Sequence, residues 1–154
     1  MAIVDFPELK ALLVREGRLM ALDVGSKTIG VATSDMTRML ATPLMTVKRT
    51  KLAVDLGVLG ELAKKHEARA LAIGLPLNMD GTEGPRAQAT RAFARNLSKL
   101  TALPIALWDE RWSTAAVERA LIEADASRKK RKAVVDQHAA AYILQGALDR
   151  LARN

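Results

Sequence analysis

Acidic residues stand at three places in the sequence where apolar residues are expected. Asp23 interrupts the apolar run 19–24, which has the length and composition of a buried strand. Glu110 follows the apolar run 104–108, and Asp136 stands on the apolar stripe of the last helical segment. An ionised carboxylate that is buried without a partner costs several kcal/mol, so each of these acids needs a reason, and a bound cation is a common one.

Carboxylates from a first strand, a later strand and a final helix would supply the hard oxygen ligands that Mg²⁺ or Mn²⁺ prefers. Such a site serves phosphoryl transfer. Other chemistry is sparse, because the chain contains no cysteine and only two histidines. His138 could carry a proton beside Asp136, although a helix-surface histidine is the simpler interpretation. Ser113 and Thr114 are expected to cap a helix, with no histidine placed to activate them.

Each acid also has a local explanation. Asp23 could hold the turn that follows it, and Asp136 could be the N-cap of its helix. Asp109 and Glu110 are neighbours and are followed by Arg111. Neighbouring residues of a strand face opposite sides, so one acid can face the core while the other pairs or caps. The sequence leaves open which of the two does so.

The elements that must position these acids follow from hydrophobic periodicity and from turn residues. Three early strands at hairpin spacing, followed by alternating helices and strands, predict an α/β fold with a mixed five-stranded sheet and helices on both faces. Ligand sites in such sheets form where strand ends meet. The expected strands are 19–24, 28–33, 42–47, 70–75 and 104–108, and the expected helices are 5–17, 52–66, 85–100, 114–123 and 135–152.

The composition indicates one globular domain. The chain has 154 residues, of which 49% are hydrophobic and 27% charged, so we expect a single domain over 1–154 with 1–17 as a helical extension packed on it. The absence of cysteine excludes a disulfide framework and fits a reducing compartment. The sequence shows no signal peptide and no apolar run long enough to span a membrane. We therefore expect a cytoplasmic protein with no membrane partner.

The charge of the chain points to a polyanionic partner. The net charge is +7 and the isoelectric point is about 10.1, which makes nucleic acid the first candidate. The aromatic content of 3% argues against recognition of single strands by base stacking, so we expect contacts with the backbone. Five consecutive cations are expected to form a flexible, solvated loop that can clamp phosphates. They are Arg128, Lys129, Lys130, Arg131 and Lys132.

Four segments together resemble the YqgF/RuvX family, the Holliday-junction-resolvase-like nucleases with an RNase H-like fold. They are LDVGSKTIGVATSD from Leu22, IGLPLNMDGT from Ile73, DERWST from Asp109 and VDQHAAAYILQ from Val135. The segments occur in the family's order and run through most of the chain. Two departures are Trp112, where a smaller apolar residue is common, and an extension before Arg18 that is longer than usual.

The resemblance implies that Asp23, Glu110 and Asp136 are the catalytic and metal-binding acids, with Mg²⁺ or Mn²⁺ as cofactor. It implies a cytoplasmic nuclease that matures the 5′ end of pre-16S ribosomal RNA, with resolution of branched DNA junctions as the alternative. The oligomeric state stays open between a monomer and a homodimer, although a resolvase acting on two strands would need two sites.

The segments beside the acids are expected to position phosphates. Lys27, Arg111 and the loop around Asn78 border the predicted site. Asp80 is expected to shape a turn with Gly81 and not to bind metal.

Two other functions remain open. The D-x-G-x-K-x-x-G pattern that begins at Asp23 also resembles the phosphate loop of actin-like ATPases, but those enzymes close two such domains around a nucleotide. A non-catalytic RNA-binding factor of ribosome assembly, with the acids as structural remnants, is the stronger rival. A carboxylate-dependent Mg²⁺ response separates a nuclease from such a binder.

Overall fold

The computed structural model describes residues 3–13, 15–112 and 128–153, and their side chains within 3–13, 15–111 and 138–153. The helix expected at 114–123, together with Ser113 and Thr114, lies outside the described residues.

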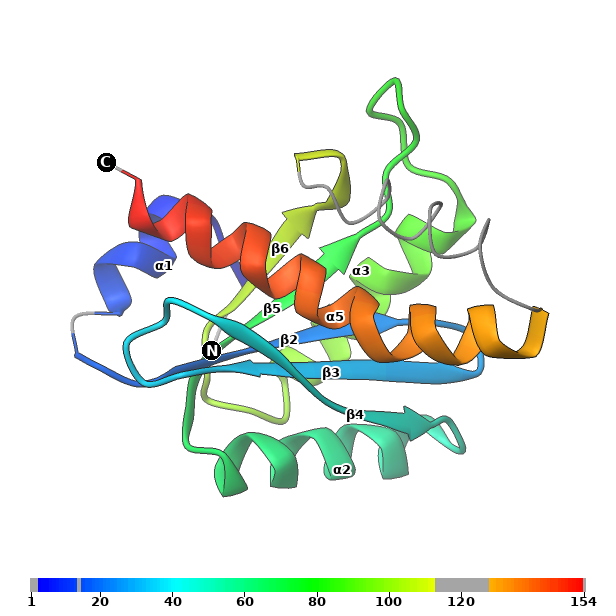
Figure 1. Cartoon of the computed structure of the whole chain (residues 1–154), viewed down its shortest axis with the longest axis horizontal. Coiled ribbons are helices and arrows are strands. Elements are labelled where there is room, and N and C mark those ends of the chain that lie inside the picture. Colours follow the sequence, from blue (N-terminus) through cyan, green and yellow to red (C-terminus); the bar gives the residue numbers. More distant parts are fainter. Residues whose placement is uncertain (1–2, 14, 113–127, 154) are drawn as a thin grey trace.

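The described strands form one mixed six-stranded sheet in the order β1-β6-β5-β2-β3-β4 (Figure 1). The neighbours β2, β3 and β4 are antiparallel, whereas β5 and β6 run parallel to β2. This confirms the expected mixed α/β sheet. The sheet has one strand more than expected, because β1 is only two residues long and too short to show a hydrophobic pattern. The strands are β1 (Ile3–Val4), β2 (Arg18–Val24), β3 (Thr28–Ser34), β4 (Ala41–Lys48), β5 (Ala68–Leu75) and β6 (Ile105–Asp109).

Four α-helices are described. They are α1 (Phe6–Leu12), α2 (Leu52–Lys65), α3 (Pro85–Ser98) and α5 (Arg128–Ala152), and a 3₁₀ turn (Glu110–Trp112) follows β6. Asp5 caps the first helix, since its side chain accepts a hydrogen bond of 2.9 Å from the backbone N–H of Glu8. The helix ends before the expected Gly17, and Arg38 donates hydrogen bonds to the carbonyls of Leu13 and Gly17 in the segment that follows it.

The last helix begins earlier than the sequence analysis expected. The predicted basic loop 128–132 is the start of α5, which was expected to begin at Val135. Lysine and arginine are good helix formers, so a run of cations continues a helix that is anchored elsewhere by packing. The N-cap interpretation of Asp136 is therefore wrong, because Asp136 lies well inside α5.

Helices cover both faces of the sheet (Figure 1). Alternate residues of β2 pack on opposite faces: Met20 and Leu22 join the core with α2 and α3, whereas Leu19 and Ala21 join the core with α1 and α5. This two-sided burial explains why β2 and β5 read as continuous apolar runs. Small residues line the second core where α5 crosses the sheet, which lets the helix approach the strands closely. They include Ala21, Ala32, Ala70, Ala72 and Ala106.

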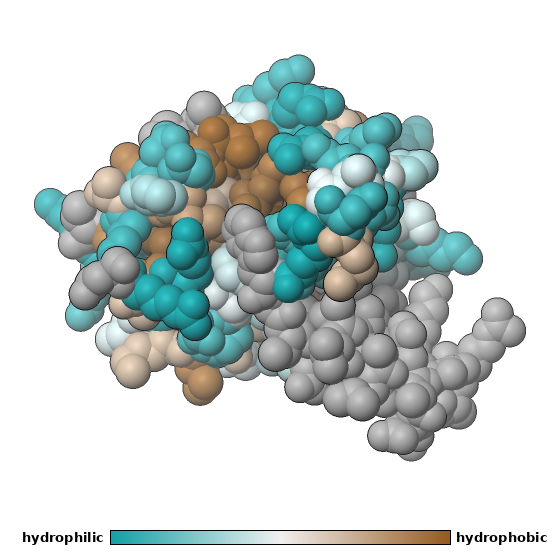
Figure 2. All heavy atoms as spheres, turned by 90° about the horizontal axis from the view of Figure 1, so that it is seen from above, coloured by the Kyte–Doolittle hydropathy of each residue, from teal (hydrophilic) through white to brown (hydrophobic). Residues whose placement is uncertain are grey.

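The surface of the molecule is mixed. On the face seen from above, hydrophilic residues surround a smaller hydrophobic area in the described part of the chain (Figure 2). In that part, none of the helices has the length and apolar character needed to cross a membrane.

Candidate functional site

Strand register brings Asp23 and Glu110 to the same end of the sheet. In the pairing of β2 with β5, Leu22 lies opposite Ile73, so Asp23 is level with Gly74. In the pairing of β5 with β6, Gly74 lies opposite Trp108. Glu110 follows Trp108 by two residues. The two acids thus stand on either side of the end of β5.

Both carboxylates also lie on the face that α5 covers. Asp23 shares its face of β2 with Ala21, a member of the core beneath α5. A Cβ atom added at Gly74 would lie 2.5 Å from Cδ1 of Ile143 in α5 and 3.4 Å from Cδ of Glu110. The carboxyl group of Glu110 therefore lies close to Gly74, on the face of β5 that Ile143 of α5 contacts. Asp23 is 9% exposed and Glu110 is 5% exposed, so both acids are buried.

The third predicted acid is placed by its backbone alone. Asp136 belongs to α5, and its side chain lies outside the described residues. It precedes Ala139, Ala140 and Ile143 by three, four and seven residues, and all three are fully or almost fully buried against the sheet. Asp136 therefore lies at a position on the face of α5 that packs against the strands. Among the residues whose side chains are described, no three acidic, histidine or cysteine side chains form a metal-binding group.

Asp109 has a different role from its neighbour. Nε of Arg111 donates hydrogen bonds of 3.1 Å to both carboxylate oxygens of Asp109, and Nη2 donates one of 2.7 Å to Oδ2. The backbone N–H of Arg111 adds a bond of 3.0 Å to Oδ1. Burial alone would raise the pKa of Asp109, but the hydrogen bonds and positive charge of Arg111 outweigh it and hold this pKa below its ordinary value. Asp109 therefore fixes the turn after β6 through Arg111.

The residues present fit a hard divalent cation. Two buried carboxylates from neighbouring parts of the sheet offer oxygen donors of the kind Mg²⁺ and Mn²⁺ prefer. Nη2 of Arg86 lies 3.7 Å from Oδ1 of Asp23 and supplies positive charge to the same group. Glu110 is almost entirely shielded from solvent, and a cation between the acids would balance both charges.

Hydrogen bonds among its own residues hold the loop between β5 and α3 in shape. Oδ1 of Asp80 accepts hydrogen bonds from the backbone and the hydroxyl of Thr82, which lower the pKa of Asp80. The side-chain amide of Asn78 donates a hydrogen bond of 2.9 Å to the same hydroxyl. Asp80 therefore shapes this turn, as expected. Arg111 reaches the loop through a hydrogen bond of 3.3 Å to the carbonyl of Met79, so the predicted residues Asn78 and Arg111 border one region.

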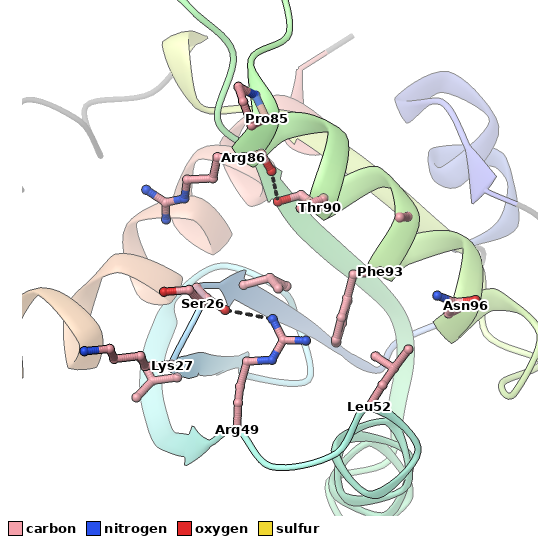
Figure 3. A pocket seen from close by; sticks show the side chains of 14 residues that line it. Ser26, Lys27, Arg49, Leu52, Pro85, Arg86, Thr90, Phe93 and Asn96 are labelled. Atoms are coloured by element: carbon pink, nitrogen blue, oxygen red, sulfur yellow. Dashed lines mark hydrogen bonds between the residues drawn. The ribbon is translucent and has the colours of Figure 1, made fainter.

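Lys27 lies in a different place from Asn78. It lines a pocket of about 870 Å³ between the β2–β3 turn and α3 (Figure 3). The same pocket contains Arg49 and Arg86, and the sequence analysis did not place Arg86 in the site. A cation in the first turn of α3 opposes the helix dipole, and this was the one local signal that could have drawn attention to Arg86.

Solved structures support the fold. The chain resembles Thermus thermophilus RuvC in complex with a Holliday junction substrate, with a TM-score of 0.56, 11% sequence identity, and coverage of 88% of this chain and 96% of that chain. A second RuvC structure from the same organism gives a TM-score of 0.53 at 12% identity, covering 87% and 96%. At this identity the likeness concerns the fold, which is RNase H-like.

Sequence relatives are much closer. A protein of Rhodobacter capsulatus is 60% identical over 92% of this chain and 89% of its own length. A protein of Methylocella silvestris is 58% identical over 98% of this chain and 94% of its own length. One of Rhodopseudomonas palustris is 63% identical over 88% of this chain and 84% of its own length. All three are named as candidate pre-16S rRNA nucleases. The profile described as "RuvX: Holliday junction resolvase" matches residues 17–150. The chain therefore belongs to the RuvX family.

Proposed function

We propose that this chain is a Mg²⁺- or Mn²⁺-dependent endonuclease that hydrolyses phosphodiester bonds during maturation of the 5′ end of pre-16S ribosomal RNA in the cytoplasm. The observation that supports this most is the burial of Asp23 and Glu110 at one end of the sheet, on the face that α5 covers. The names of the relatives supply the substrate.

In this proposal the three acids hold the cation. Asp23 and Glu110 offer oxygens from the two sides of β5, and Asp136 completes the set from α5. A bound Mg²⁺ would supply Lewis-acid polarisation of the phosphate and lower the pKa of an attacking water. Because both described acids are buried, their charges act on the site with little screening by solvent.

Basic residues bring the substrate to the acids. Lys27 and Arg86 border the site from one side, and Arg111 and the loop around Asn78 border it from the other. The cations 128–132 at the start of α5 add attraction for the phosphate backbone that is independent of sequence. In this arrangement the acids perform the chemistry and the cations provide affinity.

A cleavage assay on matched substrates tests the proposal. Purified protein is incubated with a precursor RNA that carries the 5′ extension of 16S rRNA, with and without Mg²⁺ or Mn²⁺. We expect metal-dependent cleavage that Asp23→Asn lowers by a factor of about 100 or more. Glu61→Gln is the control, since Glu61 is an exposed acid of α2 that does not line the pocket beside the acids. Equal activity of Asp23→Asn and wild type would contradict the assignment.

The same assay includes a second candidate function. The RuvX profile and the fold shared with RuvC favour resolution of a four-way DNA junction. Cleavage of the junction but not of the RNA would establish the resolvase. Metal-independent binding of RNA without cleavage would establish a ribosome-assembly factor that has kept its acids for structural reasons.

A further inference from the structure

The pocket beside Lys27 has rigid walls. One wall is the turn between β2 and β3, and the other is the side of α3 that carries Arg86 and Phe93, with Arg49 between them (Figure 3). Arg49 holds the turn in place: its backbone N–H donates to the carbonyl of Lys27 at 2.9 Å, and its Nη1 donates to the carbonyl of Gly25 at 2.9 Å. A Cβ atom at Gly25 would lie 2.9 Å from the carbonyl oxygen of Thr28, so the turn can close this tightly only with glycine. The pocket is therefore a built feature of the fold.

The side chain of Arg49 is held in place by contacts with Asp55 and Phe93. Its Nε lies 3.5 Å from Oδ2 of Asp55, a carboxylate that is 1% exposed, and its guanidinium lies 5.4 Å from the centre of the Phe93 ring. One face of the guanidinium therefore packs on Phe93. The side chain of Arg49 is 25% exposed and lines the pocket, and a planar cation held in this way offers a platform on which a nucleobase can stack.

The pocket is electropositive. Lys27, Arg49 and Arg86 line it, and none of its lining residues is acidic. It also contains the start of α3, where Gly84 provides no side-chain cap and the first turn has no acid. The unpaired N–H groups and the dipole at that end of the helix favour an anion. Lys27 and Arg86 extend from the two walls toward the same end of the pocket (Figure 3).

That end of the pocket joins the site of the acids. Arg86 lines the pocket and also lies 3.7 Å from the carboxylate of Asp23. A polyanion bound at the acids would thus pass Lys27 and Arg86 before it reaches Arg49. The volume of about 870 Å³ suits a nucleotide-sized group and is too small for a duplex.

We infer that this pocket binds the single-stranded segment of the nucleic acid that flanks the cleaved bond. A phosphate lies between Lys27 and Arg86, and a base stacks on the guanidinium of Arg49 with Asn96 at its polar edge. The inference rests on the proposed nuclease function for the position of the cleaved bond, but the binding itself requires no chemistry.

Ala89 provides a test that leaves these contacts in place. It is an exposed residue of α3 and lines the pocket. Ala89→Glu puts a negative charge in the pocket, and Ala89→Lys puts a positive one there; both residues are good helix formers, so α3 is kept. Gln88→Glu is the matched control, because it adds the same charge at the neighbouring exposed position, which does not line the pocket.

The measurement is fluorescence anisotropy with a labelled single-stranded RNA that spans the 5′ processing site, in EDTA so that no cleavage occurs. We expect Ala89→Glu to weaken binding about tenfold, Ala89→Lys to strengthen it, and Gln88→Glu to change it less than about twofold. Shortening the RNA from one of its two ends should abolish the difference between Ala89→Glu and Gln88→Glu.

The outcomes separate this inference from the proposed function. Equal binding by Ala89→Glu and Gln88→Glu overturns the inference, whatever the cleavage assay gives. The inference is also overturned if the two variants still differ in RNA affinity after the RNA has been shortened from either end, since the added charge then acts at long range. If the difference in RNA affinity requires one end of the RNA but the protein cleaves no substrate, the pocket is upheld as a binding site and the proposed nuclease function is refuted.

Discussion

Nη2 of Arg86 and Oδ1 of Asp23 lie 3.7 Å apart, although α3 and the face of β2 that carries Asp23 are on opposite sides of the sheet. The guanidinium reaches around the end of the sheet to the acid. In the proposed metal site, a bound cation would therefore compete with this guanidinium for the carboxylate of Asp23. The side chain of Arg86 is 55% exposed, so solvent screens the pair and the competition is weak.

Replacing Arg86 should separate metal binding from substrate binding. We expect Arg86→Gln to tighten Mn²⁺ binding by no more than about fivefold, because an exposed ion pair contributes about 1 kcal/mol or less. The same variant should bind RNA more weakly, since a phosphate loses its partner. Isothermal titration with Mn²⁺ and anisotropy with RNA measure the two effects. Arg91 lies on the same helix as Arg86 and pairs with Glu83, and Arg91→Gln should leave Mn²⁺ affinity unchanged.

The neighbours Asp109 and Glu110 should give opposite phenotypes. Glu110→Gln should lower cleavage about 100-fold or more and weaken Mn²⁺ binding, because a ligand charge is lost. Asp109→Asn should keep Mn²⁺ affinity but destabilise the fold by about 1–3 kcal/mol, since the buried partner of Arg111 is weakened. Urea unfolding and Mn²⁺ titration of both variants check this. Loss of Mn²⁺ affinity in Asp109→Asn alone would reverse the assignment.

Gly74 should tolerate a methyl group only when α5 gives way. A Cβ there would lie 2.5 Å from Cδ1 of Ile143, so Gly74→Ala should destabilise the protein by about 1–3 kcal/mol. Ile143→Val removes that carbon and by itself costs about 1 kcal/mol. The double variant should be more stable than the sum of the two single effects predicts. Additive free energies of unfolding would show that the strain lies at Cγ1 of residue 143, which is 3.1 Å from the added Cβ and is kept by valine.

Asp35 should contribute to acid sensitivity. Its carboxylate accepts hydrogen bonds from the hydroxyl of Thr37 and from the backbone N–H groups of Leu40 and Met39, which lower its pKa from 3.8 to about 2. The folded protein thus binds this proton less tightly than the unfolded chain. The stabilisation is complete above the unfolded pKa and is lost as pH falls from about 4 to about 2.

Two measurements test the role of Asp35. Asp35→Asn should lose less stability than wild type between about pH 4 and about pH 2 in urea unfolding. NMR titration of the Asp35 carboxyl carbon should give a midpoint near 2. A midpoint at the ordinary value of 3.8 would mean that these hydrogen bonds do not persist in solution.

The start of α5 and Asp136 should do separable jobs. Neutralising the cations 128–132 should weaken binding of every nucleic acid and flatten the plot of log K against log salt, with little change in cleavage at saturating substrate. Asp136→Asn should leave affinity near wild type or raise it, while cleavage collapses. Lys64→Gln with Lys65→Gln is a control at the end of α2 remote from Leu52, which lines the pocket. If neutralising the cations 128–132 leaves the slope of log K against log salt unchanged, nucleic acid binds instead at Lys27, Arg49 and their neighbours.

Local signals in the sequence were sufficient for most of the fold. Asp5 and Pro7 are residues typical of a helix start, and the continuous apolar run ending at Leu75 is typical of a strand that is covered on both faces. Such elements are set by neighbours in the sequence. The two-residue β1 was missed because Ile3 and Val4 become a strand only by pairing with Ile105 and Ala106.

The parts of the site that escaped prediction depend on distant residues. The approach of Arg86 to Asp23 joins residues far apart in the chain, and no local pattern encodes it. The sequence did not show which of Asp109 and Glu110 pairs with Arg111, and the structure shows that it is Asp109. The cations at the start of α5 looked like a solvated loop because charge runs are common in loops, although the same residues favour helices.

The last strand of the described sheet, β4, bears on how copies of this chain behave when they are crowded together. Pro43 has no N–H to offer another strand, and the pairing of β4 with β3 shifts register between Val31 and Ala32. An incoming strand thus meets a gap and a bend where it would need an unbroken row of donors and acceptors. This edge therefore opposes the strand-on-strand growth that begins amyloid-like aggregation.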